Sequence, residues 1–420
     1  MNLRNWAGNY SYHASRVHRP ATVQQVQELV HGARKVKGLG TRHSFNDIAD
    51  TPEDLISLEH LNRVVSLDRD RSTLTVEGGI TYGALDEVLD REGFALHNLA
   101  SLPHISIVGA CATATHGSGD VNGNLATSVA GMQIVTAAGS LVQLSRDRDG
   151  DAFNGVPVGL GGLGIVTRVT LDVEPTFHVA QVVYERLPVA QLDEHFDEIT
   201  SSAYSVSLFT DWQGSTVNQV WRKHRLSEGQ ALLAEPMFFG ASLATEKLHP
   251  LEGVSALNCT EQMGTAGPWY QRLPHFKMEF TPSNGNELQS EYLMPRQYAV
   301  EAMRAIRELR DNLSPHLFIS EVRTVAADAL WMSPCYNRDC VGIHFTWKQH
   351  WPEVRKLLPL IEEKLEPFEA RPHWGKLFTI SPSRMQGLYQ RMPDFQRLLR
   401  SNDPEAKFSN RFVDRYVFGM

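Results

Sequence analysis

Cysteine is scarce in this 420-residue chain, and its four copies form no C-x-x-C pair. Single, scattered cysteines are typical of free thiols in a reducing compartment, and here they are Cys111, Cys259, Cys335 and Cys340. The chain also lacks any apolar run of about 18 residues, so no membrane span is predicted. The first residues lack the apolar segment of a secretory signal, and we therefore expect a cytoplasmic protein.

Dense basic charge is missing too. The formal net charge is −8, and no long run of Lys and Arg occurs, which argues against a nucleic-acid-binding surface. The chain has neither a Walker A pattern nor an H-E-x-x-H pattern, and no metal site is predicted. A chain of this length exceeds one ordinary hydrophobic core, so about two domains are expected.

The periodicity of apolar residues predicts a mixed α+β protein. In the first part of the chain we predict helices at 22–33 and 82–89, strands at 36–39, 73–76 and 166–173, and a hairpin at 132–144. After about residue 176 aromatic residues and proline become more frequent, with strands predicted at 204–212 and 217–222 and helices at 298–313 and 351–365. The predicted divisions are a first domain at 1–176, a second α+β domain at 177–376, and a C-terminal segment at 377–420 that packs back on the first.

Residues 159–164 match the G-x-G-x-x-G pattern of nicotinamide-dinucleotide-binding proteins. That mechanism requires a helix after the glycines, because the helix N-terminus holds the pyrophosphate. The sequence that follows, 165–171, is β-branched and predicts a strand. We therefore interpret 159–164 as a flexible loop where the backbone approaches a ligand or another strand.

The segment 37–46, Lys-Gly-Leu-Gly-Thr-Arg-His-Ser-Phe-Asn, combines two glycines with a histidine. Gly38 and Gly40 allow the backbone to approach a ligand closely. His43 supplies a ring nucleophile, because a neutral imidazole is available near pH 7. A backbone cradle beside a nucleophile suits a bulky cofactor that is held covalently, such as a flavin. The alternative is a histidine hydrogen-bonded within a turn.

A second unusual segment, 100–119, contains almost no large or charged side chain. Its hydroxyls and backbone N–H groups can donate hydrogen bonds to a pyrophosphate. Taken alone, it fits equally well a buried turn rich in glycine and alanine.

Together, G-L-G-T-R-H-S-F-N and the later S-L-P-H-I-S-I-V-G-A…T-H-G-S-G resemble the vanillyl-alcohol-oxidase-type flavoproteins, which have a PCMH-type FAD-binding domain. Segments at 259–262, 291–296, 321–328 and 371–376 are similar to the alditol (xylitol) oxidases of that family. The resemblance covers essentially the whole chain. It implies an FAD-binding domain followed by an α+β cap domain with a large antiparallel sheet.

The resemblance implies FAD attached covalently through His43. The implied cofactor-binding residues are Gly38, Leu39, Gly40, Thr41, Arg42, His43, Ser44, Ser101, Ser106, Gly109, Thr113, Ala114, Thr115, His116 and Ile165. Arg42 departs from the small residue that is common beside the attached histidine. Ala100 is implied to lie near the reactive edge of the flavin, where it narrows oxygen access in some relatives, so oxidase and dehydrogenase both remain open.

The resemblance also implies a site for a polyol. The implied substrate-binding residues are Ser101, Glu321, Arg323, Thr346 and Lys376, and the implied catalytic residues are Glu321, Arg323, His344 and Lys376. Successive hydroxyls need several convergent donors and acceptors. Residues two apart on a strand share a face, which brings Glu321 beside Arg323 and His344 beside Thr346. The alternatives are a structural Glu321–Arg323 ion pair and a solvated Lys376.

The expected function is oxidation of the terminal primary hydroxyl of an alditol (xylitol, sorbitol or glycerol) to the aldose, with O2 reduced to H2O2. Two alternatives stay open: an oxidase or dehydrogenase of sugar lactones, and a non-catalytic flavin-binding protein. We expect a monomer whose partners are the polyol and O2, with no nucleic acid, no membrane and no metal. The preferred polyol length is not encoded in any motif.

Overall fold

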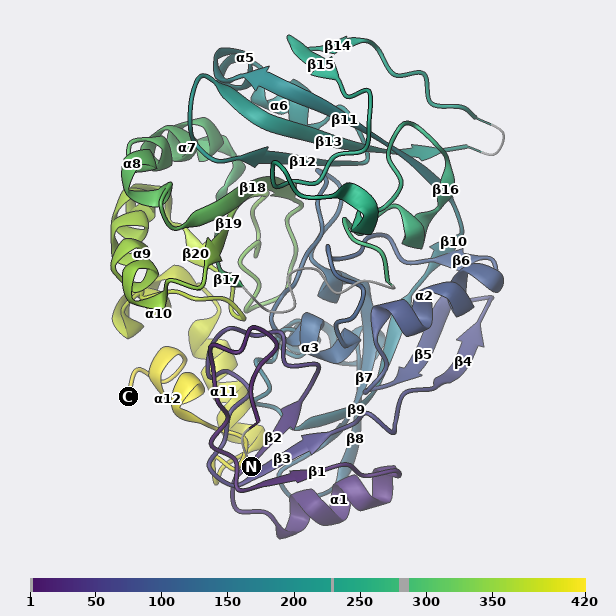
Figure 1. Ribbon diagram of the computed structural model, residues 1–420. Coiled ribbons are helices and arrows are strands. Elements are labelled where there is room, and N and C mark those ends of the chain that lie inside the picture. The colour runs from purple at the N-terminus through teal and green to yellow at the C-terminus, as the bar shows by residue number, and fades with distance from the viewer. Residues whose placement is uncertain (1–2, 228–229, 279–286) are drawn as a thin grey trace.

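The structure is a computed structural model that describes residues 3–227, 230–278 and 287–420. Its described strands form four sheets, and Figure 1 shows that the two largest lie in different halves of the molecule. The predicted α+β class is confirmed. One buried apolar cluster continues from Val76 and Val169 in the first half to Tyr292 and Phe345 in the second, so the halves share a core.

The chain begins with a small parallel sheet of order β1-β3-β2. Its strands are β1 (Arg16–His18), β3 (Asp54–Ser57) and β2 (Val36–Leu39), and helix α1 (Val23–Gly32) connects β1 to β2. Thr22 caps α1 by accepting a hydrogen bond from the Gln25 N–H, and Val26 and Val30 are buried. The predicted helix and strand here are confirmed. Strand β2 leads straight into the glycine segment.

An antiparallel sheet of order β4-β5-β9-β7-β8 follows. Its strands are β4 (Val64–Asp68), β5 (Thr73–Glu77), β9 (Ile165–Asp172), β7 (Val129–Val135) and β8 (Leu141–Ser145). The hairpin β7–β8 turns at Gly139, whose φ of 76° suits glycine. The loop 159–164 runs into β9 and not into a helix, which confirms that it is no nicotinamide fingerprint.

Shorter elements join these sheets. They are helix α2 (Tyr82–Arg91), capped by Thr81, helices α3 (Ile107–Ala112) and α4 (Arg146–Asp149), and the strand pair β6 (Phe94–Ala95) and β10 (Glu174–Pro175). The predicted helix at 82–89 is confirmed and extends to Arg91. Helix α3 lies within the second unusual segment of the sequence.

The second half is built on a ten-stranded sheet of order β14-β15-β11-β13-β12-β18-β19-β17-β20, with β16 paired to β11. The strands are β11 (His178–Pro188), β12 (Ser205–Thr210), β13 (Thr216–Leu226), β14 (Met237–Phe238), β15 (Ala241–Leu243), β16 (Gly267–Pro268), β17 (Glu287–Pro295), β18 (Leu317–Val325), β19 (Cys340–Lys348) and β20 (Arg371–Pro372). Its pairs in this path are antiparallel, as the resemblance implied.

Helices cover the outer face of this sheet in Figure 1. They are α5 (Val189–Glu194), α6 (Phe196–Thr200), α7 (Ala299–Arg307), α8 (Arg310–Leu313) and α9 (Trp351–Leu365). The prediction of α9 is confirmed. The prediction of one helix at 298–313 is wrong, because the chain leaves the α conformation at Leu309. The Leu309 N–H donates to the Ile306 carbonyl, three residues back, in a tight turn.

The last segment forms α10 (Pro382–Leu388), α11 (Met392–Asn402) and α12 (Arg411–Tyr416). It contacts the first half directly. The Val36 N–H donates to the Lys407 carbonyl, and Asn410 Nδ2 donates to the carbonyls of Asp47, Ile48 and Asp50. These contacts attach the end of the chain to the glycine segment.

None of the helices in this described part combines the length and apolar character that a bilayer crossing requires. Over the same residues, no group of three His, Cys, Asp or Glu side chains is placed to hold a metal ion.

Candidate active site

A cavity of about 430 Å³ lies between the two halves and draws its lining from both. One side, which we call the loop wall, consists of residues 37–45 and 100–116. The opposite side, the sheet wall, consists of cavity-facing residues of β17, β18 and β19 and of residues 373–376. The size is that of an ordinary ligand pocket.

The loop wall is held together by contacts that only small residues permit. A Cβ added to Gly40 would lie 2.7 Å from Ser106 Oγ, so a side chain there would clash. Thr41 Oγ1 accepts a hydrogen bond from the Ser106 N–H at 3.1 Å. The two unusual segments of the sequence, 37–46 and 100–119, are therefore in direct contact.

Backbone donors on the loop wall remain open. Among the described residues, the N–H groups of Thr41, Arg42, His43 and Ser44 meet no protein acceptor. Consecutive unpaired N–H groups facing a cavity require a ligand or water as acceptor. An anionic pyrophosphate meets that requirement, so the loop wall fits the FAD that the sequence implies.

His43 is positioned by an aromatic neighbour. Its ring stacks on Trp6, with centroids 5.2 Å apart and an interplanar angle of 26°. Burial, with smaller contributions from His104 and Arg42, lowers the pKa of His43 to about 4. The ring is therefore neutral near pH 7 and keeps a lone pair for nucleophilic attack.

Arg42 has a structural explanation that its sequence context did not provide. Its φ is 64°, in the left-handed region, and its exposed side chain donates to the Arg4 carbonyl at 3.1 Å. The Trp6 N–H donates to the Arg42 carbonyl at 2.8 Å. Arg42 thus ties the attached segment to the N-terminal residues and helps to place Trp6.

Most of the predicted site residues line the cavity. They are Gly38, Leu39, Gly40, Thr41, Arg42, His43, Ser44, Ser101, Ser106, Gly109, Thr113, Thr115, His116, Glu321, Arg323, His344, Thr346 and Lys376, together with Ala100. Ala114 and Ile165 are not among the lining residues. Both are buried in the hydrophobic clusters packed behind it, where Ile165 Cδ1 sits against Gly38.

Strand register explains how the sheet wall is assembled. Glu321 on β18 lies opposite His344 on β19, and His344 lies opposite Glu291 on β17. Cross-strand neighbours share a face, so these three side chains form one row. In the adjacent row, Arg323 lies opposite Gly342, which has no side chain to separate Arg323 from Glu291.

Glu291 is the centre of this wall and is completely buried. Its Oε1 accepts from an Arg323 Nη at 2.8 Å, its Oε2 accepts from Lys376 Nζ at 2.6 Å, and His116 Nε2 lies 3.2 Å from Oε1. Burial alone would raise the pKa of this carboxyl, but Lys376, His116 and Arg323 hold it well below its usual range. Glu291 therefore stays ionised and aligns both cations.

Glu321 is a second buried carboxylate. Its Oε1 lies 2.7 Å from His275 Nε2 and 3.6 Å from Arg323 Nε. Burial opposes ionisation, but Arg323 and His275 hold the pKa of Glu321 well below its usual range. The ion pair predicted as an alternative is thus present, and it faces the cavity.

His344 offers an open nitrogen. Its Nε2 is buried and has no hydrogen-bond partner among the described residues. Burial, together with Lys376, lowers the pKa of His344 well below its ordinary value, so the ring is neutral. A neutral ring nitrogen without a partner at a cavity is suited to a ligand hydroxyl.

The two walls are linked through Asn46, the last residue of the glycine segment. Its Nδ2 donates to the carbonyls of Trp374 and Lys376 at 2.8 and 2.9 Å, and the neighbouring Phe45 N–H donates to the Gly375 carbonyl. The loop that carries Lys376 is therefore held by the segment that carries His43. Burial lowers the pKa of Lys376, an effect that Glu291 opposes.

The sequence predictions missed four buried residues at the site: Lys223, His275, Glu291 and His373. Glu291 carried a signal, because polar residues at 287, 289 and 291 alternate along one strand. Lys223 carried none, since it stands between Arg222 and His224 in a strand with other polar residues. His275 and His373 are single histidines in loops, and only their contacts identify them.

Two family models and a known oxidase match the sequence of this chain. Residues 14–145 match the family model described as "FAD binding domain", and residues 280–416 match "D-arabinono-1,4-lactone oxidase". The chain is 45% identical over 416 residues to an alditol oxidase of Streptomyces sp. (strain IKD472 / FERM P-14339), covering 98% of each chain.

The chain belongs to the alditol oxidase family. Other family-level relatives are more distant: an L-gulonolactone oxidase of Scyliorhinus torazame at 26% identity, covering 99% of this chain and 98% of the other, and an L-gulono-1,4-lactone dehydrogenase of Mycobacterium tuberculosis (strain ATCC 25618 / H37Rv) at 27%, covering 98% of each. The predicted alditol oxidase resemblance is thereby confirmed.

Solved structures share the fold of this alditol oxidase family member. Cholesterol oxidase from B. sterolicum superposes with a TM-score of 0.78 at 15% identity, covering 99% of this chain and 96% of the other. Glucooligosaccharide oxidase from Acremonium strictum, a 6-S-cysteinyl, 8α-N1-histidyl FAD protein, gives 0.74 at 16%, covering 97% and 93%. The predicted PCMH-type FAD-binding fold with a cap domain is confirmed, and FAD is its cofactor.

Proposed function

We propose that this protein oxidises the terminal primary hydroxyl of an alditol to the aldose, using FAD attached through His43. One observation carries the proposal: two buried cations and two buried carboxylates line the sheet wall, directly across the cavity from the loop wall that carries His43. The 45% identity to an alditol oxidase over the full chain supports the same substrate class.

The loop wall holds the cofactor. Its open N–H groups bind the pyrophosphate, and the small residues at Gly40 and Gly109 let the phosphates approach the backbone. The neutral His43 ring, held in place by Trp6, would be the side chain to which FAD is attached. Ala114 and Ile165 pack behind this wall.

The sheet wall binds the polyol. A chain of hydroxyls needs acceptors and donors in alternation, and Glu321, Thr346 and Ser101 supply them along the cavity. Arg323 and Lys376 are fixed by Glu291, so neither has to reorganise when the substrate arrives. This preorganisation is the principal source of electrostatic stabilisation in enzyme sites.

When FAD is bound, it supplies hydride acceptance from the carbinol carbon. The chain supplies the charge chemistry around that carbon. His344 Nε2 accepts the hydroxyl proton, and the positive charges of Arg323 and Lys376 stabilise the negative oxygen as it develops. O2 then receives the electrons and leaves as H2O2.

The protein works as a monomer in the cytoplasm in this proposal. Four buried free cysteines support a reducing compartment, because none is positioned in a disulfide.

A panel of substrates tests the function. Purified protein is supplied with xylitol, sorbitol, glycerol and an aldonolactone, and H2O2 is measured with a peroxidase-coupled dye. We expect H2O2 from the alditols and little from the lactone. The second candidate is a lactone oxidase or dehydrogenase, which the family model over residues 280–416 favours. Turnover of the lactone alone would establish it, and a dye acceptor in place of O2 distinguishes a dehydrogenase.

A further inference from the structure

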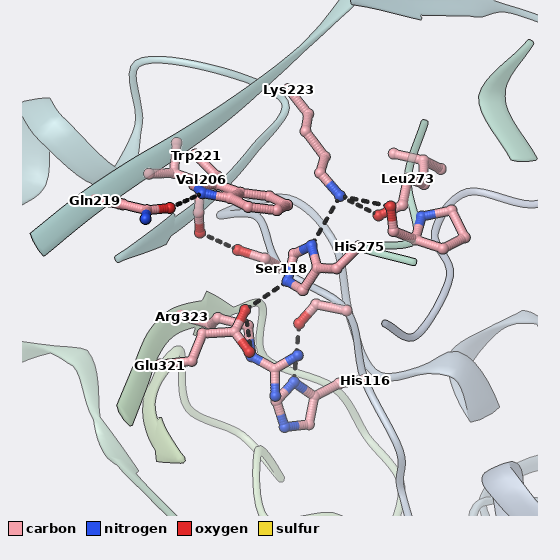
Figure 2. A network of polar contacts seen from close by, with 12 residues as sticks. His116, Ser118, Val206, Gln219, Trp221, Lys223, Leu273, His275, Glu321 and Arg323 are labelled. Carbon is pink, nitrogen blue, oxygen red and sulfur yellow. Dashed lines mark hydrogen bonds and ion pairs between the residues drawn. The ribbon is translucent and has the colours of Figure 1, made fainter. Parts of the chain in front are cut away.

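Lys223 lies behind the sheet wall and does not reach the cavity lining. It is on β13 and is 1% exposed. Its Nζ donates to the carbonyls of Leu273 and Pro274 and lies 3.1 Å from His275 Nδ1. Figure 2 shows the amine directed toward this loop and the imidazole between Lys223 and Glu321. An ammonium group has three N–H donors, and it meets three partners here.

The contact with Lys223 decides where the His275 ring carries its proton. Burial lowers the pKa of Lys223 to about 7, so below that pH the side chain is an ammonium group. A nitrogen that accepts from an ammonium group cannot itself be protonated, so Nδ1 is then the acceptor and Nε2 carries the hydrogen. Nε2 lies 2.7 Å from Glu321 Oε1 and therefore donates to it. Burial and the charge of Lys223 lower the pKa of His275 to about 4, so the ring has only this one proton.

Glu321 is left with one engaged oxygen and one open oxygen. Oε1 receives the His275 proton, whereas Oε2 has no partner among the described residues, and the side chain faces the cavity. An ionised carboxylate accepts hydrogen bonds and donates none. The ligand atom beside Oε2 must therefore carry a hydrogen, which a hydroxyl has and a carbonyl oxygen lacks.

We propose that Lys223 is a positioning residue that fixes the Nε2–H tautomer of His275 and so keeps Glu321 a pure acceptor, which selects hydroxyl-bearing substrates over carbonyl-bearing ones. The substrate part of this inference rests on the proposed function. A site built to pair with a substrate hydroxyl strongly rejects an analogue that lacks it, because its buried polar group is then left unpaired.

The other charged and titratable groups around Glu321 do not replace the hydrogen bond that His275 donates to it. Arg323 comes from the same strand, His344 from β19, Glu291 from β17 and Lys376 from the loop after β20, and Cys259 faces Lys223 from the cap loop. Arg323 and Lys376 are engaged with Glu291. His275 alone donates a hydrogen bond to Glu321 among the described residues.

Substitution Lys223→Met tests whether Lys223 fixes the tautomer of His275. Without the ammonium group, the Leu273 carbonyl loses its side-chain donor, whereas the Pro274 carbonyl keeps the Thr260 hydroxyl, and the His275 Nδ1–H tautomer becomes favourable. Nε2 then presents a lone pair to Glu321, which takes up a proton to avoid the repulsion. We expect the apparent KM for xylitol to rise on the order of tenfold per pH unit below the raised pKa, with kcat changing far less. In the unsubstituted protein KM stays flat between about pH 5 and 6.5, where Lys223, whose pKa burial lowers to about 7, carries its ammonium charge.

Two matched variants separate this role from a general loss of structure. Lys407→Met also removes a buried ammonium group from backbone carbonyls, those of Val30 and His31, none of which belongs to the cavity lining. Its KM should remain flat with pH. In a His275→Gln background the amide N–H donates to Glu321 without any tautomer, so adding Lys223→Met should no longer change the pH profile. An equal effect in both backgrounds contradicts the proposal.

A direct measurement of the tautomer does not depend on substrate. In the flavin-loaded protein labelled with 15N-histidine, long-range 15N–1H correlation reports the tautomer, and His275→Gln identifies the signal by its loss. An unprotonated Nδ1 with a protonated Nε2 is expected, and the reverse overturns the proposal. If no alditol is oxidised, the proposed function fails while the tautomer result still stands. If alditols are oxidised and Lys223→Met behaves like Lys407→Met, only this inference fails.

Discussion

The loop wall and the sheet wall of the cavity present different kinds of polar group to a ligand. The loop wall presents backbone N–H groups and small side chains, with His43 as its reactive ring. The sheet wall presents buried side-chain charges that pair with one another, centred on Glu291. Backbone donors suit a cofactor that stays in place, whereas oriented charges suit a substrate whose charge changes during reaction. Replacing residues in one wall should therefore affect one function and spare the other.

The largest expected effect is on the loop wall. In His43→Ala the covalent flavin should disappear completely, because the substituted side chain has no nucleophile. Yellow-green fluorescence of the 47.1 kDa band on a denaturing gel measures it. His104→Ala is the control and should keep the fluorescence, since His104 hydrogen-bonds the Met278 carbonyl and is not a lining residue of the cavity. Fluorescence retained in His43→Ala would place the bond elsewhere.

The next effect belongs to the sheet wall. Lys376→Met should lower kcat on the order of 10²–10³, because one preorganised positive charge at the developing oxygen is lost. Flavin content should not change. Lys364→Met, which removes an exposed partner of Glu308, serves as the control and should leave kcat unaffected. Normal turnover in Lys376→Met would refute its role.

At the centre of the sheet wall the expected effect is on stability. Glu291→Gln leaves Arg323 and Lys376 buried without a carboxylate, which lowers the free energy of unfolding by about 3–5 kcal/mol. Urea denaturation of the flavin-loaded protein measures the change. Glu308→Gln, in an exposed pair, should lower it by only about 0–1 kcal/mol. Equal losses in the two variants would show that the buried network contributes no more to the free energy of unfolding than an exposed ion pair does.

The smallest effect concerns pH. Because the pKa of His43 is lowered to about 4, its ring stays neutral well below pH 6. Flavin attachment to cofactor-free protein should therefore proceed at nearly the same rate at about pH 5.5 and about pH 7.5, and slow only as the pH approaches 4. With an ordinary histidine pKa, the rate at the lower pH would be roughly tenfold slower. Such a drop would contradict the buried environment of His43.

The two walls also differ in how well the sequence predicted them. The loop wall is made of two continuous segments, so glycines, hydroxyls and His43 are visible as local patterns. The sheet wall is assembled by register between strands far apart in the chain, and no local pattern announces that Glu291, His344 and Glu321 form one row. The resemblance implied His344 and Glu321 as site residues, but it included Glu291 only as the first residue of the matching segment 291–296 and gave it no role.

Particular residues show where local reasoning ends. Both ends of helix α9 were predicted correctly, because the spacing of its apolar residues is regular along its length. The break at Leu309 depends on tertiary packing, which the spacing of apolar residues does not show. Arg42 was unexplained in the sequence because its partner, the Arg4 carbonyl, is a tertiary contact. Lys223 was missed because a lysine among other polar strand residues is ordinarily exposed, and only the ten-stranded sheet buries it.

The central claim is that the cavity brings a covalently held flavin and an alditol together. Anaerobic mixing of the purified protein with xylitol, followed by flavin absorbance, tests it most directly. We predict loss of the oxidised flavin bands with xylitol, and their return with release of H2O2 when air is admitted. Bands that persist with xylitol, sorbitol and glycerol alike would contradict the account and favour a lactone enzyme or a non-catalytic flavin-binding protein.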